Sequence, residues 1–167
     1  LNMALKGSPL TRNITETAMN KAQIPNPALN PLSVLTGEWK AVGTHFALPD
    51  VTLHGRSSFK WIEGGAFLLW VSEVYYEGIP VGIAIIGSDD VTGNYYMLYF
   101  DERKVSRKYD VSVGENTIKY WRNAPGFSQR YTWNIVDEGD TIIGKGELST
   151  DGSVWEPDLN LTYTRVK

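Results

Sequence analysis

The chain has 167 residues, of which 42% are hydrophobic and 12% aromatic, and this length suits one domain that buries roughly 70% of its unfolded surface. The net charge is −3 and the lysines and arginines are scattered, which excludes the basic stripe of a nucleic-acid-binding protein. The chain contains no cysteine, which excludes thiol catalysis, disulfide bonds and cysteinyl zinc sites.

The N-terminal segment, residues 1–30, is polar, carries three prolines and shows no sustained period of 2 or 3.6 residues. We interpret it as an extended or partly disordered arm with one helical turn near residues 15–21. It is either a mobile tail or an arm that packs on its own barrel or on a second subunit. The segment has no signal-peptide core, although the chain does not begin with Met, so we expect a cytoplasmic protein and leave secretion or periplasmic location open.

From residue 31 onward, segments rich in Val, Ile, Tyr, Phe and Trp alternate with turn residues, which is typical of an all-β domain. This pattern predicts a single domain over residues 31–167, opened by a short helical turn. The expected strands are 38–46, 52–62, 66–76, 79–87, 94–101, 105–113, 117–122, 127–136, 141–149 and 155–165. Short turns favour an antiparallel up-and-down meander, and closure into a barrel of roughly ten strands removes both unpaired edges. A barrel of this size encloses a ligand cavity, whereas the alternative is a two-sheet sandwich.

Hydrophobic segments are too short for a membrane helix, which needs about 20 apolar residues, so we expect no membrane span. Residues 66–76 and 79–87 are nevertheless apolar on both faces. An outer face of that kind needs a cover. The candidates are the N-terminal arm and a second copy of the chain, and we favour a homodimer through strands 66–87.

Two segments carry a family resemblance. "PLSVLTGEW" (31–39) resembles the opening of calycin barrels, the group of lipocalins and fatty-acid-binding proteins, and "LTYTR" (161–165) resembles their last strand. "FKWIEGGAFL", "YYMLYFDER", "FSQRY" and "GDTIIGKGELSTDGSVWEPD" look, in this order, like a bacterial domain-of-unknown-function family of calycin-like barrels. The resemblance implies that Trp39 lies across the closed end of the barrel under Arg165. It implies a fold and no common activity.

Strand alternation then predicts which residues face the interior. Starting from Trp39, the inward positions of the first strand are Ala41, Gly43 and His45, with His45 near the mouth above two small residues. On the last strand the inward positions are Arg165, Tyr163, Leu161, Leu159 and Pro157, while Asp158 is expected to face out. On the second strand we expect Leu53, Gly55, Ser57, Phe59 and Trp61 inside.

The function that these positions favour is the binding of an apolar or aromatic small molecule. The predicted lining comprises Ala41, Gly43, Phe59, Trp61, Met97, Tyr109, Tyr131 and Tyr163, with His45 and one arginine holding a polar end. Because fatty-acid-binding relatives hold a ligand carboxylate with an Arg and Tyr pair, the resemblance suggests Arg107 with Tyr109 for that role. The alternative for this pair is a surface or structural contact.

A second hypothesis is a cavity enzyme of cyclase, isomerase or hydrolase type. Its proton carrier would be His45 or a buried carboxylate such as Glu147, which we include in the predicted lining. The other carboxylate candidates are Glu73, Asp101, Glu156 and Asp158. Haem ligation by His45 or His54 is disfavoured, because the haem-binding relatives supply their ligand late in the chain, where this sequence has no histidine. We therefore expect no cofactor and no metal. A closed, solid barrel that serves as an interaction module is the third hypothesis.

Overall fold

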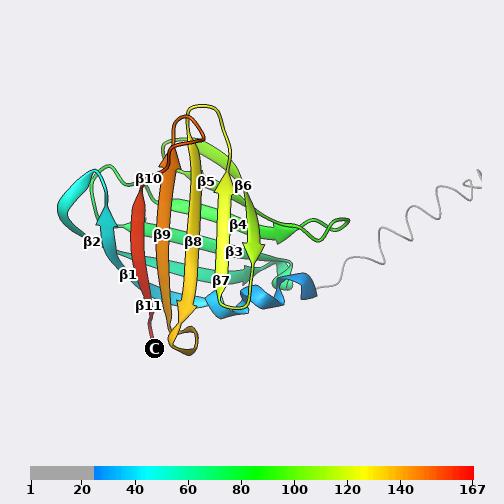
Figure 1. The fold of residues 1–167 in the computed structure, drawn as a ribbon. Helices are drawn as coiled ribbons and strands as arrows, with labels where there is room; N and C mark the ends of the chain where they lie inside the picture. Colours follow the sequence, from blue (N-terminus) through cyan, green and yellow to red (C-terminus); the bar gives the residue numbers. More distant parts are fainter. Residues whose placement is uncertain (1–24) are drawn as a thin grey trace, which may run out of the picture.

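The computed structural model describes residues 25–167, which form an antiparallel β-barrel with a 3₁₀ helix at one end (Figure 1). The helices are η1 (Pro27–Leu35), η2 (Glu63–Gly65) and η3 (Asp137–Gly139). The strands are β1 (Gly37–His45), β2 (Leu48–Ile62), β3 (Phe67–Val74), β4 (Gly82–Ser88), β5 (Tyr95–Asp101), β6 (Val105–Val113), β7 (Thr117–Arg122), β8 (Ser128–Val136), β9 (Thr141–Ser149), β10 (Glu156–Pro157) and β11 (Leu159–Arg165).

Consecutive strands pair as neighbours from β1 to β9, which confirms the predicted meander. β11 lies between β9 and β1 and closes the barrel, while β10 continues the line of β11 along β9. The predicted last strand, residues 155–165, is therefore divided into β10 and β11. In the part of the chain that the structure describes, no helix reaches the length and hydrophobicity that a membrane span requires.

One end of the barrel is sealed by η1, and Figure 1 shows this helix and the C-terminus at the same end. Leu29, Leu32 and Leu35 are completely buried there. Asn26 caps η1 by accepting a hydrogen bond from the Ala28 amide. Residues 27–30, which the sequence analysis assigned to the arm, thus belong to the barrel. The remainder of the expected arm, residues 1–24 with its helical turn, lies outside the described residues.

The contact expected between Trp39 and Arg165 is present at this closed end. The two residues are directly paired across β1 and β11, and the guanidinium carbon lies 4.2 Å from the centroid of the indole ring. The Arg165 guanidinium also donates hydrogen bonds to the carbonyl oxygens of Val34, Thr36 and Gly139, and the Trp39 indole N–H donates to the carbonyl of Leu35. These contacts join η1, β1, η3 and β11.

Above the seal, the core is built from interlocking aromatic rings. Phe59 stacks on Trp70 at a centroid distance of 5.7 Å, and Trp133 packs edge-on against both. Such pairs each contribute about 0.5–1.5 kcal/mol beyond the burial of their area. The core therefore fills the lower part of the barrel with side chains and leaves the space near the opposite end.

Candidate functional site

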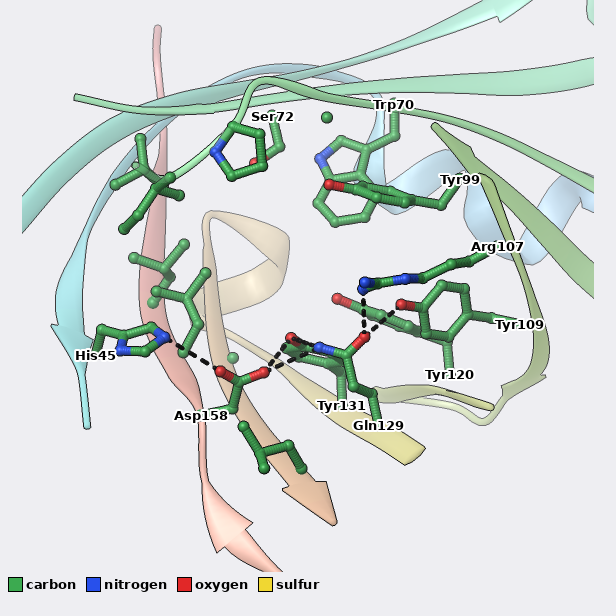
Figure 2. Close-up of a pocket in the computed structure, with 18 of the residues that line it drawn as sticks. His45, Trp70, Ser72, Tyr99, Arg107, Tyr109, Tyr120, Gln129, Tyr131 and Asp158 are labelled. Carbon is green, nitrogen blue, oxygen red and sulfur yellow. Dashed lines mark hydrogen bonds and ion pairs between the residues drawn. The ribbon is translucent and has the colours of Figure 1, made fainter. Parts of the chain in front are cut away.

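The upper half of the barrel contains a cavity of about 340 Å³. It opens toward the end of the barrel that carries His45 and Arg103, and Figure 2 shows the side chains that point into it. Aromatic rings dominate the lining, namely Trp70, Tyr99, Tyr109, Tyr120, Phe127, Tyr131, Trp133 and Tyr163. This volume lies at the small end of the roughly 300–1,000 Å³ range of small-molecule sites.

Two glycines make room for the rings of this lining. A Cβ atom on Gly146 would lie 2.3 Å from Cε1 of Tyr131, and a Cβ on Gly82 would lie 2.6 Å from Cε2 of Tyr99. The tyrosine rings therefore lie flat over the glycine backbone on neighbouring strands. Without these glycines the two rings would have to move into the cavity.

Asp158 points into the cavity, although strict alternation from Arg165 predicted that it faces out. Leu161 lies four positions after Pro157 along β10 and β11. Their partners on β9, Gly144 and Glu147, are only three positions apart. The extra residue is a β-bulge, which reverses the alternation on one side of it. As a result Asp158 and the adjacent Leu159 both line the cavity, while Pro157 is exposed and not inside as predicted.

The carboxylate of Asp158 is only 7% exposed and is held by three side chains. Its Oδ2 atom accepts hydrogen bonds from the Tyr131 hydroxyl at 2.8 Å and from the Gln129 amide nitrogen at 3.0 Å, and its Oδ1 lies 3.3 Å from Nε2 of His45. Figure 2 shows these contacts along one side of the cavity. They balance the cost of burying a carboxylate, which would be high without such partners.

Gln129 connects this carboxylate to the basic side of the cavity. While its amide nitrogen donates to Asp158, its Oε1 accepts hydrogen bonds from the Tyr109 hydroxyl at 2.6 Å and from the Arg107 guanidinium at 3.0 Å. The donors and acceptors around the amide therefore fix its orientation. Gln129 was not among the predicted lining residues, although it lies two residues before Tyr131, which was predicted to line the cavity, on the same strand.

Arg107 brings a positive charge to the cavity wall. Its guanidinium carbon lies 4.7 Å from the centroid of the Phe127 ring, and its only side-chain hydrogen bond within residues 25–167 is the one to neutral Gln129. No carboxylate of the described chain forms an ion pair with it, whereas Arg103 at the same opening is paired with Asp101 at 2.7 Å. The remaining N–H groups of Arg107 are therefore available for an anion.

His45 lies at the rim, and both of its ring nitrogens are engaged. Nδ1 accepts a hydrogen bond from the Ala47 amide at 3.1 Å, so in the neutral ring the proton resides on Nε2, which faces Asp158. The lone pair that a general base needs thus points at the backbone of the β1–β2 turn. This arrangement makes His45 a structural element of the rim and leaves it poorly placed to accept a proton from a ligand.

The tyrosines of the lining remain protonated over the physiological range. Burial raises the pKa values of Tyr109, Tyr120, Tyr131 and Tyr163 above the ordinary value, and for Tyr131 the neighbouring Asp158 raises it further. At the rim, hydrogen bonds from Arg103 lower the pKa of Asp101 to about 2. The cavity therefore presents phenol donors, one buried carboxylate and one arginine, Arg107, that has no acidic partner in the described part of the chain.

The structure brings most of the predicted lining together. His45, Met97, Arg107, Tyr109, Tyr131 and Tyr163 all line the cavity. Ala41 and Phe59 face inward as predicted but pack in the core and do not reach the cavity. Gly43 does not line the cavity either. Its backbone lies against β11, since a Cβ on Gly43 would lie 1.8 Å from the carbonyl oxygen of Asn160. The missing side chain lets β11 approach β1 and creates no hollow, contrary to our interpretation.

Two predicted lining residues lie elsewhere. Trp61 is in phase with the inward row of β2, but it stands just before the end of that strand, at the closed end of the barrel, and is 37% exposed. Glu147 faces the outer surface, where the Arg130 guanidinium donates to both of its oxygens and lowers its carboxyl pKa. Glu147 is paired across the strands with Arg130 of β8. Because Tyr131 faces inward, the adjacent Arg130 and its partner Glu147 face outward.

The enzyme hypothesis loses most of its predicted proton carriers. Glu73 pairs with Arg56 on the outside of the barrel, and Glu156 is exposed. His54, the second candidate for haem ligation, is exposed on β2. Only His45 and Asp158 of the named candidates line the cavity, and both have their polar atoms engaged with other protein groups.

Comparison with known proteins shows a fold and no family. No family model matches the chain, and no curated protein matches it. Among solved structures, the crystal structure of Rv2717c from M. tuberculosis is similar, with a TM-score of 0.62 over 87% of this chain and 100% of that chain. The sequence identity is 14%, so this similarity concerns the barrel architecture alone.

Proposed function

We propose that this protein binds a small ring compound with an anionic end, and that Arg107 holds the anion. The observation that carries the proposal is the guanidinium of Arg107, which lines an aromatic cavity of about 340 Å³ without a carboxylate partner among the described residues. The side chain is half-buried, and its unused N–H groups can donate charge-assisted hydrogen bonds to an anion. A planar carboxylate suits the remaining donors of the guanidinium.

The shape and composition of the lining favour a ring over a long chain. Rings of Trp70, Tyr120, Trp133 and Tyr163 surround the inner part of the cavity, and a flat ligand can stack or pack edge-on against them. A volume near the lower limit of ligand sites accommodates one or two rings more readily than an extended fatty acid. Aromatic or alicyclic carboxylic acids are therefore the class that we propose.

The test is a binding titration followed by tryptophan fluorescence, since Trp70 and Trp133 both line the cavity. Probes are cinnamic acid, its methyl ester, octanoic acid and a neutral terpenoid. We expect the free aromatic acid to bind at least about tenfold more tightly than its ester, because the ester forfeits a charge-assisted contact.

The variant Arg107→Gln should abolish this difference between acid and ester. Arg130→Gln is the matched control, because Arg130 lies on the outer face with Glu147 and does not line the cavity. Equal binding of acid and ester by the unchanged protein, or an equal loss in both variants, would refute the role of Arg107.

We also propose that the outer face of β3, β4 and β5 mediates self-association. Cross-strand pairs on this face join Val71 to Ile83 and Ile83 to Phe100, and Ile83 and Phe100 are 45% and 42% exposed. Phe67 and Leu98 extend the apolar area. Contiguous exposed apolar surface of this kind is typical of an interface. Light scattering of the unchanged chain and of Ile83→Lys tests it, and a monomer at every concentration of the unchanged chain refutes it.

A further inference from the structure

Two tyrosine hydroxyls in the cavity have no hydrogen-bond partner among residues 25–167. Tyr120 and Tyr163 are 6% and 5% exposed, and both line the cavity. Neither hydroxyl makes a hydrogen bond to another residue of the described chain. Every fully enclosed side-chain nitrogen or oxygen of the described residues has a hydrogen-bond partner, so these two oxygens cannot be fully enclosed. The two hydroxyls are therefore not sealed in the core, and they open onto the cavity.

Other phenols of the same lining differ in this respect. The hydroxyls of Tyr109 and Tyr131 are used by Gln129 and Asp158, and that of Tyr99 by Asp101. Buried polar groups are normally paired, so a residue that is more than nine-tenths buried and directs an unused hydroxyl into a cavity points to something that occupies the cavity. Ordered water or a polar ligand group can serve as that partner.

The two residues belong to the aromatic lining of the cavity, and Tyr163 lies nearer the closed end. On β11, Tyr163 is the next inward position after Arg165, which seals the closed end. Tyr120 stacks on Tyr131 and packs edge-on against Trp133, and Trp133 in turn packs against Tyr163. Trp133 thus contacts both tyrosine rings, so the two form part of one aromatic cluster below the His45 rim. Because burial raises both pKa values, the hydroxyls stay protonated and can donate.

We infer that the ligand of this cavity carries a second oxygen function, which accepts a hydrogen bond from the hydroxyl of Tyr120, of Tyr163 or of both. This inference rests on the proposed function, because it places the ligand's anionic end at Arg107. The ligand class becomes a ring acid with a hydroxyl or carbonyl oxygen on its ring. A hydrocarbon ring or an unsubstituted alkyl chain would leave both donors without a partner once it displaced the water.

A measurement without ligand tests the first step. Replacing an unpaired hydroxyl that faces water should change stability little, so Tyr120→Phe and Tyr163→Phe should keep the melting temperature of the unchanged protein. The matched variants Tyr109→Phe and Tyr131→Phe each remove a hydrogen bond to a buried group and should lower it by about 2–4 °C. A loss of that size in Tyr120→Phe or Tyr163→Phe would show a protein partner and overturn the inference.

Calorimetric titration with cinnamic acid and its three monohydroxy isomers tests the second step. At least one hydroxy isomer should bind about 3- to 10-fold more tightly than cinnamic acid, as one additional hydrogen bond permits. This preference should disappear in Tyr120→Phe or in Tyr163→Phe, while binding of cinnamic acid itself remains. Arg130→Gln should preserve both.

The outcomes separate the two proposals. If all four acids bind alike, or if both Phe variants keep the preference, the second oxygen site is refuted while the proposed function stands. If none of the acids binds to the unchanged protein at millimolar concentration, the proposed function is contradicted and the inference falls with it.

Discussion

The two ends of the barrel use similar residues for different purposes. At the closed end, the guanidinium of Arg165 lies over Trp39, donates to three carbonyl oxygens and forms an ion pair with Asp140. Near the mouth, the guanidinium of Arg107 lies over Phe127 but makes one hydrogen bond to an amide. The donors of Arg165 are used by the protein, whereas Arg107 retains donors that no residue from 25 to 167 uses.

The polar groups of the closed end are hydrogen-bonded within the protein, whereas some of those near the mouth have no partner among the residues that the structure describes. We therefore call the closed end the structural half of the barrel and the cavity end the binding half. The closed end should matter for stability and little for binding. The lining of the cavity should matter for binding, except where a side chain such as Asp158 is tied into the wall. Substitutions at matched positions can break or sharpen this division.

The largest effect should follow Trp39→Ala at the closed end. The indole is 1% exposed, packs under Arg165 and donates a hydrogen bond to the carbonyl of Leu35. Its removal should lower the free energy of unfolding by about 3–5 kcal/mol, as for other buried aromatic residues. Urea unfolding followed by circular dichroism measures this. A loss below about 1 kcal/mol would mean that the closed end is not the structural half.

Asp158→Ala should have the next largest effect. It leaves the Gln129 amide and the Tyr131 hydroxyl without their acceptor, and water can enter from the cavity to replace it in part. We expect a loss of about 1–3 kcal/mol in the free energy of unfolding. The control is Glu147→Ala, which breaks an exposed pair and should cost at most about 1 kcal/mol. Equal effects of the two substitutions would argue against a structural role for the buried carboxylate.

Arg107→Gln should change the free energy of unfolding by less than about 0.5 kcal/mol, or increase it, because within residues 25–167 the guanidinium has no acidic partner to lose. Affinity for an aromatic acid should nevertheless fall at least about tenfold. Thermal unfolding and ligand titration of the same preparation measure both quantities. Strong destabilisation without a change in affinity would place Arg107 in the structural half.

The smallest effect concerns alkaline pH. Burial raises the pKa values of Tyr120, Tyr131 and Tyr163 in the folded state, so the folded protein holds these protons more tightly than the unfolded chain does. Their contribution is fully present below the unfolded pKa of about 10 and is lost as the pH rises from there toward the higher folded values. Ultraviolet difference spectra should show these tyrosines ionising only together with unfolding. Reversible ionisation near pH 10 in the folded protein would contradict it.

Much of the fold could be predicted because the segments rich in strand-forming residues and the turn residues between them indicate the same strand boundaries. The strands β6, β7 and β9 have the predicted bounds, and the pairing of Trp39 with Arg165, which the resemblance to calycin barrels implied, is present. Alternation correctly placed Ala41, Leu53 and Phe59 in the interior. Period-2 reasoning succeeds there because β1 and β2 pair without irregularity at these positions.

The site could be predicted only in part, for two physical reasons. A bulge of one residue reverses alternation locally and brings Asp158 inside, and the sequence signals it only through Pro157, a residue that strands tolerate mainly at edges, starts and bulges. A glycine can mean either empty space or a close approach of backbones, and at Gly43 it means the second. Gln129 could have been found, because it shares the face of Tyr131, but amides carry no distinctive functional signal.

The most direct test of the binding half is a crystal structure of the protein with cinnamic acid. We expect the aromatic ring to lie among Trp70, Tyr120 and Trp133 and the carboxylate to contact the guanidinium of Arg107. A cavity that holds only water while the acid occupies the outer surface, or a ring inside with its carboxylate turned away from Arg107, would contradict this expectation.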